Sequence, residues 1–194
     1  MLEKLKDFLS AYLAGALIAL GCSIFWLSGG GVVGAILFSI ALTTICYLKL
    51  NLFTGKVGFL LAEKKIDFLK LLVILLGNLV GAFVMGCLLN TLPIAAAASF
   101  TLPQLEFAMA GGFACGMLMY IAVKLFQFGQ PLGIFLCVPA FILSGFTHRI
   151  ALIGYITLAQ MWSWQSLATV GMAVLGNSLG AYFVSLNLKI LEEF

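Results

Sequence analysis

Four long runs of apolar residues constrain this chain more than any other feature of its sequence. They cover residues 9–28, 69–92, 105–126 and 167–190. Each has the length, about 20 residues, that an α-helix needs to cross the hydrocarbon core of a bilayer. The chain is 63% hydrophobic and only 9% charged, so it has too little polar surface to cover a water-soluble globule. The sequence therefore predicts an all-α membrane protein.

Two further apolar segments are too long for one span, and polar residues interrupt both of them. Residues 32–62 are interrupted at 49–51 and 54–56, and residues 131–160 are interrupted at 144–149. Irregular backbone at membrane depth is tolerated only where it is buried in protein or lines a wet cavity. We therefore expect six transmembrane helices, of which the second and the fifth are broken.

Positive residues predict the orientation of the chain. Regions 28–33, 93–105 and 158–166 contain no Lys or Arg, and these regions share one side of the predicted membrane. Cytoplasmic flanks carry the excess of positive charge, so both termini are expected in the cytoplasm, at the plasma (inner) membrane. The first apolar run is expected to stay as a span, because it lacks the exit of a cleavable signal peptide. The flanking cations on the predicted cytoplasmic side are Lys4, Lys6, Lys64, Lys65, Lys70, Lys124 and Lys189.

An internal repeat divides the chain into two similar halves. The sequence LGNLVGA at 76–82 returns as LGNSLGA at 175–181, and Phe-Thr occurs at both predicted breaks. Each half, about 8–92 and 104–190, has three spans, so the halves of this single domain (1–194) enter the membrane in opposite directions. Matched breaks in such a 3+3 inverted repeat point to a substrate path. The repeated Gly-x-x-x-Gly also predicts close helix packing.

Several motifs, taken in order, make the chain resemble the formate/nitrite transporter family. They are AGALIALG at 14–21, GAILFS at 34–39, LFTG at 52–55, GN at 77–78 and GF-x-H at 145–148, and the resemblance covers nearly the whole chain. It implies an aquaporin-like fold and a homopentamer with a pore inside each protomer. It also implies a passive or proton-coupled channel for small monovalent anions such as formate, nitrite or hydrosulfide.

The resemblance also implies which residues line the pore. Leu52 and Phe53 narrow the pore from the loop in the second span, and Thr54 in the same loop faces the central histidine, His148. Phe141 forms the second, aromatic constriction. Met119 stands where the fourth span contributes a small apolar residue.

Four positions at the breaks depart from the family pattern. Asn51 and Thr147 stand where a glutamate is expected, Lys56 replaces an asparagine, and Arg149 replaces a serine. Each break thus lacks a carboxylate and carries a cation. Lys56 and Arg149 are candidates for attracting anions, although helix-end carbonyls are alternative partners for both. The sequence assigns no role to Lys49.

His148 is the single histidine of the chain and lies at the second break. An ionisable residue inside a membrane is a functional candidate by default. Its ordinary pKa of about 6.5 lies close to physiological pH. An anion that gains a proton there avoids much of the cost of entering a low-dielectric constriction as a bare charge. The alternative is a hydrogen-bonded core histidine.

Other classes of function find little support in the sequence. No cofactor and no metal site is expected, because the five cysteines lie singly in apolar runs without a histidine nearby. The net charge of +3 is small and scattered, which does not favour nucleic-acid binding. One histidine without an intramembrane carboxylate argues against an enzyme. A neutral-solute channel of aquaporin type, without the Asn-Pro-Ala triplets, and a transport-dead structural or regulatory homologue remain as alternatives.

Overall fold

Eight helices make up the described part of the chain in the computed structural model, which covers residues 2–59, 67–92, 94 and 99–192. The Lys64–Lys65 loop, on which the predicted orientation partly depends, lies outside these residues. In chain order the helices are α1 (Leu2–Leu27), α2 (Gly31–Tyr47), α3 (Phe53–Lys56), α5 (Phe68–Leu89), α6 (Leu105–Gln127), α7 (Leu132–Leu143), α8 (Arg149–Leu158) and α9 (Trp164–Glu192).

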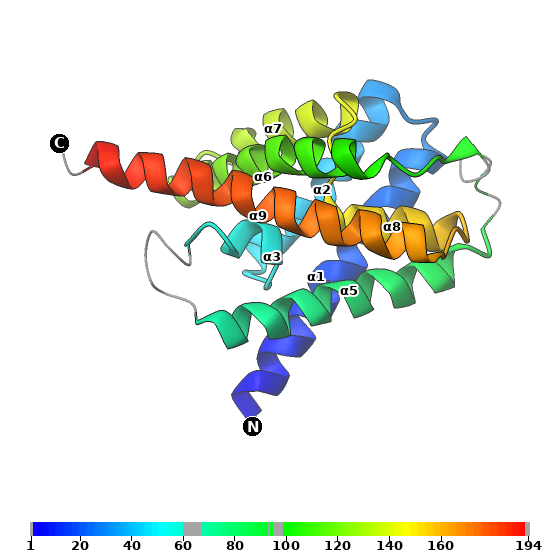
Figure 1. Cartoon of the computed structure of the whole chain (residues 1–194), viewed down its shortest axis with the longest axis horizontal. Coiled ribbons are helices and arrows are strands. Elements are labelled where there is room, and N and C mark those ends of the chain that lie inside the picture. The colour runs from blue at the N-terminus through cyan, green and yellow to red at the C-terminus, as the bar shows by residue number, and fades with distance from the viewer. Residues whose placement is uncertain (1, 60–66, 93, 95–98, 193–194) are drawn as a thin grey trace.

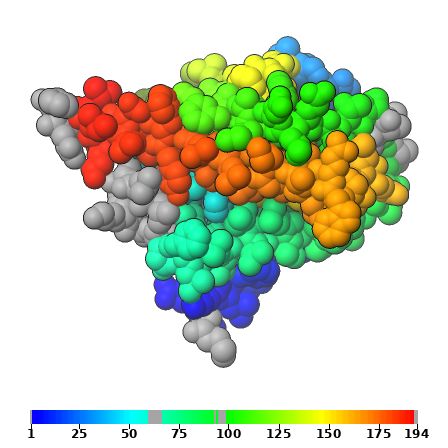
Figure 2. Space-filling view, viewed as in Figure 1, coloured from blue at the N-terminus to red at the C-terminus, as the bar shows by residue number. Residues whose placement is uncertain are grey.

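Four of these helices, α1, α5, α6 and α9, are long and apolar enough to cross a membrane. Three shorter apolar helices, α2, α7 and α8, accompany them. The long helices expose many large apolar side chains, and Figure 2 shows the face on which α9 runs between α6 and α5. A surface of this kind suits lipid and not water. Exposed examples on α5 and α9 are Leu72, Leu76, Val80, Phe83, Leu175, Leu179, Phe183 and Leu186.

The helices extend beyond the apolar runs that predicted them. α1 begins at Leu2, although its apolar run begins at residue 9, and α9 runs from Trp164 to Glu192. The charged residues Glu3 and Asp7 therefore lie in the first turns of α1. An apolar run marks the part of a helix that contacts hydrocarbon, whereas a helix ends where its backbone loses its partners.

Both predicted breaks are present, with one correction. The chain is not helical at 48–52 and at 144–148, and left-handed backbone occurs at Lys49 (φ 54°) and Gly145 (φ 70°). Gly145 adopts this conformation without strain, whereas Lys49 is an uncommon residue there. The correction is that both breaks end earlier than expected: residues 54–56 form most of the short helix α3, and Arg149 is the first residue of α8.

Two tight helix pairs organise the molecule. In Figure 1, α6 and α9 lie side by side, α1 crosses α5, and the short helices α3 and α8 lie between the two pairs. Gly81 of α5 packs against the Tyr12 carbonyl of α1, and Gly180 of α9 packs against the Phe113 carbonyl of α6. A Cβ atom at either glycine would overlap that carbonyl. The packing role predicted for the repeated glycines is therefore confirmed.

Adding a methyl group at Gly180 is expected to destabilise the protein by about 1–3 kcal/mol, because α9 must then move away from α6. Gly171, in the same helix, has no atom within 4 Å of the position that a Cβ would take. Gly171→Ala is therefore a matched control. Thermal unfolding of both variants in detergent measures the effect, and equal melting temperatures would contradict the assigned packing.

Candidate functional site

The two breaks meet in the middle of the molecule through Thr54 and His148. Thr54 Oγ1 lies 3.2 Å from Nε2 of His148, and both residues are buried. The Ala151 backbone N–H donates to Nδ1 of His148 at 3.1 Å, so the imidazole is the side-chain cap of α8. Because Nδ1 accepts this bond, the neutral ring carries its proton on Nε2 and donates it to Thr54. The contact that the resemblance implies is thus present.

Two fully buried asparagines hold the breaks in place. Asn78 of α5 accepts a hydrogen bond from the Phe53 N–H (2.8 Å) and donates to the carbonyls of Ala11 (2.7 Å) and Asn51 (2.8 Å). Its side chain therefore joins α1, α5 and the first break. Backbone groups freed by the break find their partners in this amide, as buried polar groups must.

Asn177 of α9 repeats this arrangement in the second half. It donates to the carbonyls of Gly112 and Thr147, each at 2.8 Å, and its Oδ1 faces the Arg149 N–H at 3.4 Å. Each partner in one half has its counterpart in the other: Ala11 with Gly112, Asn51 with Thr147, and Phe53 with Arg149. The Leu-Gly-Asn repeat is thus also a repeat of hydrogen bonds. The expected match of the two Phe-Thr pairs was wrong, because the counterpart of Thr147 is Asn51 and not Thr54.

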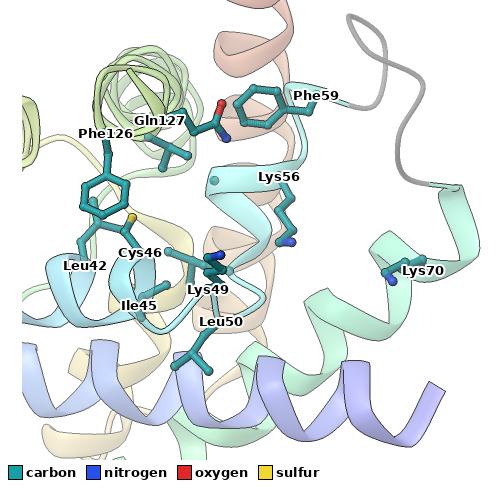
Figure 3. A pocket seen from close by; sticks show the side chains of 13 residues that line it. Leu42, Ile45, Cys46, Lys49, Leu50, Lys56, Phe59, Lys70, Phe126 and Gln127 are labelled. Atoms are coloured by element: carbon teal, nitrogen blue, oxygen red, sulfur yellow. The ribbon is translucent and has the colours of Figure 1, made fainter. Parts of the chain in front are cut away.

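A cavity of about 690 Å³ opens beside the first break. Figure 3 shows Lys56 extending into it from α3 and Lys70 from α5, with Lys49 between α2 and α3. Leu52 and Gly55 of the first break also line it, and none of its described lining residues is acidic. A surplus of positive charge in the lining of a cavity concentrates anions in that cavity. Lys49, to which the sequence assigned no role, therefore belongs to this lysine-lined cavity.

A second cavity, of about 400 Å³, opens beside the second break. Its wall is aromatic, and the second break contributes Gly145, Thr147 and His148. No Lys, Arg, Asp or Glu lines this aromatic cavity among the described residues. The two cavities therefore differ in character: one presents cations and the other presents apolar rings. The aromatic cavity is lined by the rings of Phe25, Trp26, Phe100, Phe107, Phe141, Phe146 and Tyr155.

The predicted constriction residues lie in different surroundings. Phe141 lines the aromatic cavity and stacks on His148, with ring centroids 5.6 Å apart. The ring of Phe38 also contacts Phe141, edge to face, with ring centroids 6.2 Å apart. Leu52 lines the lysine-lined cavity. Met119 is buried in the main core, and neither described cavity includes it among its lining residues. Its role in the pore stays a prediction.

Phe53 and Arg149 form a pair behind the Thr54–His148 contact. Phe53 belongs to a separate core cluster and lines neither cavity, so its pore-lining role also stays a prediction. The Arg149 guanidinium carbon lies 3.8 Å from the centre of the Phe53 ring. Its Nη1 donates to the Val174 carbonyl at 3.0 Å and to Ser178 Oγ at 3.2 Å. The cation is completely buried.

Asp7 of α1 explains one departure from the family pattern. Its carboxylate accepts a hydrogen bond from Asn51 Nδ2 at 3.0 Å and pairs with Lys70 Nζ at 2.8 Å. A glutamate at position 51 would face this carboxylate and be repelled by it, whereas an asparagine can donate to it. The carboxylate missing from the first break is thus supplied by another helix.

Sequence reasoning missed the asparagines as site residues and missed Lys70 as a cavity residue. Asn78 and Asn177 were noted only as part of a repeat, although two polar amides at equivalent depths of two apolar spans were an available signal. For Lys70 no signal existed, because its place in the cavity depends on how α5 packs beside the first break.

Comparisons with known proteins agree on one family. The family profile described as Formate/nitrite transporter matches residues 2–189. A solved structure described as an "FNT family ion channel" is 26% identical, with a TM-score of 0.78 over 95% of this chain and 89% of that one. Another, a "Pentameric formate channel with formate bound", is 22% identical, with a TM-score of 0.81 over 99% and 98% of the two chains. No curated protein sequence matches significantly.

Proposed function

Since the chain belongs to the formate/nitrite transporter family, we propose that it is a passive or proton-coupled channel for small monovalent anions such as formate, nitrite or hydrosulfide. Membership makes it a multi-pass membrane protein from a family of channels and transporters, and not an enzyme. The observation that carries the proposal is the buried Thr54–His148 contact, which joins two breaks that each have a cavity beside them. One structural relative is itself a formate channel with formate bound.

The proposed path begins in the lysine-lined cavity, where Lys49 and Lys56 attract the anion. It then passes the narrow region that holds Leu52, Phe141 and His148. There the anion takes a proton from the water at the site, directly or through His148, which regains from water each proton that it passes on. The neutral acid then crosses low dielectric at far lower cost than the anion. It leaves through the aromatic cavity, which offers no charge to bind an anion.

The fold proposed for this channel has six spans in one domain, 1–194. The first break divides the second span, α2 with α3, and the second break divides the fifth span, α7 with α8. The two halves, about 8–92 and 104–190, form a 3+3 inverted repeat. The paired hydrogen bonds of Asn78 and Asn177 support this arrangement, because equivalent residues in the two halves make equivalent bonds.

Flux measurements in proteoliposomes test the function directly. Formate, nitrite, hydrosulfide and chloride should be compared from about pH 5 to about pH 8, with empty liposomes as the control. We expect formate or nitrite to move faster than chloride, and Lys56→Gln to slow the flux. Uptake of a neutral solute without any anion flux would favour the aquaporin-type alternative. Absence of both would favour a transport-dead homologue.

A homopentamer with one pore in each protomer is the assembly we propose. It is supported by the pentameric relative and by the apolar outer surfaces of α5 and α9, which suit contact between protomers as well as lipid. Native mass spectrometry in detergent should show five copies. A monomer or a dimer as the sole species would contradict this assembly.

Both termini are proposed to lie in the cytoplasm at the plasma (inner) membrane. The lysine-rich flanks of the spans support this orientation. An impermeant thiol reagent added to intact cells should then fail to label a cysteine introduced at position 4. A cysteine introduced at position 162, on the lysine-free side, should be labelled, and the opposite pattern would overturn the orientation.

A further inference from the structure

Three buried side-chain atoms in the described part of the chain have no hydrogen-bond partner, and all three flank His148. They are Thr147 Oγ1, Arg149 Nε and Arg149 Nη2. Nearly all buried polar atoms in native proteins are paired, so orphaned atoms at a functional position call for a ligand. The orphans on Arg149 are both N–H donors on a cation. The ligand that such donors bind is an anion.

Arg149 has no negative partner among the described residues. Its Nη1 contacts are a carbonyl and a hydroxyl, and its face lies on the Phe53 ring. The titratable groups that reach it are His148 beside it, Cys115 of α6 and Tyr182 of α9, none of which is a carboxylate. The described acidic residues lie at or near helix ends instead, as Glu3, Asp7, Asp67, Glu106 and Glu192.

A guanidinium stays charged in proteins, and a buried charge without a counter-ion is strongly unfavourable. We propose that Arg149 binds a small monovalent anion in the middle of the membrane through its Nε and Nη2 N–H groups. These two groups form a planar fork that matches the two oxygens of a carboxylate or of nitrite. A spherical ion such as chloride fits the fork less well. The site therefore favours planar oxyanions.

Arg149 lines neither cavity itself but contacts or adjoins residues next to both. It follows His148, which lines the aromatic cavity, and it packs on Phe53, whose neighbour Leu52 lines the lysine-lined cavity. An anion held there lies beside the imidazole that would protonate it. That the bound anion is also a transported substrate rests on the proposed function. The binding itself can be measured without any flux.

Anion-induced thermal stabilisation of the detergent-purified protein tests the binding. Sodium formate, nitrite and chloride are titrated against the wild type, Arg149→Gln, Arg149→Lys and the control Lys189→Gln, which removes an exposed cation from the end of α9. Formate and nitrite should raise the melting temperature of the wild type and of the control. The affinity should fall by about tenfold or more in Arg149→Gln, because two charge-assisted hydrogen bonds are lost. Arg149→Lys keeps the charge without the fork, so it should retain part of the affinity.

The outcomes separate binding from transport. Stabilisation by formate together with formate flux identifies the bound anion as substrate, whereas equal stabilisation by chloride identifies a resident counter-ion. No stabilisation of the wild type, or equal stabilisation of Arg149→Gln, would overturn the proposal. If Arg149→Gln does not assemble, Arg149→Lys alone tests the proposal. An Arg149→Lys protein with the anion affinity and the formate preference of the wild type would overturn the proposed fork. A wild type that binds formate but shows no flux would refute the channel and not the site.

Discussion

Replacing His148 with Asn is expected to remove the pH dependence of anion flux while leaving the fold intact. Asparagine is a good N-cap, so it can accept the Ala151 N–H bond that His148 Nδ1 accepts now. It cannot titrate near neutral pH. Positioned proton transfer contributes about 10²–10⁴-fold in enzymes. We therefore expect the normalised flux at about pH 5 to fall by tenfold or more, with some conduction retained.

His148→Phe extends this test by removing the cap as well as the titrating group. It should also abolish the pH dependence of flux, and assembly should be checked by the oligomer peak on gel filtration. If His148 is only a packed core residue, both variants act through stability. Flux per assembled oligomer would then keep its wild-type pH profile, and that result would contradict proton transfer through His148.

Replacing Asn177 with Leu is expected to destabilise the protein more than adding a methyl group at Gly180. Leucine leaves the buried Thr147 carbonyl without the Asn177 donor and removes the acceptor that faces the Arg149 N–H. The Gly112 carbonyl loses its second donor but stays within the helix α6. Each unsatisfied buried group costs about 1–3 kcal/mol, so the total reaches several kcal/mol. The second break should lose its fixed shape, and His148 should lose its position opposite Thr54.

Asn187→Leu is the matched control for this variant. Asn187 lies in the same helix and is exposed, and its amide donates to the Phe183 carbonyl within that helix. Thermal unfolding should separate the two variants clearly, and Asn78→Leu should behave like Asn177→Leu, because it makes the equivalent bonds. Equal melting temperatures for Asn177→Leu and Asn187→Leu would refute the bracing role.

The family, the spans and the breaks could be predicted because each depends on local composition or on a motif. Lipid selects long apolar helices, and polar residues inside an apolar run are tolerated only where they are buried in protein or line a wet cavity. Residues 49–51 and 144–149 therefore marked the breaks correctly, except that Arg149 begins α8. The expected extension of the first break to residues 54–56 was wrong, since Asn78 and the packing of α6 and α9 allow that segment one helical turn. Tertiary contacts overrode the local pattern there.

By itself the sequence determined that the chain lies in a membrane and that it consists of two similar halves. Its resemblance to a family implied that His148 and Thr54 face each other. These conclusions follow from hydropathy, from an internal repeat and from motifs, all of which can be read along the chain without knowing how the helices pack. Only the tertiary structure decided that Lys49 and Lys70 share a cavity with Lys56, that Asp7 replaces the missing carboxylate, and that Arg149 is buried on Phe53 without a counter-ion. The physical reason is that electrostatic partners come from different helices, and the distance between helices is set by packing that no single segment encodes.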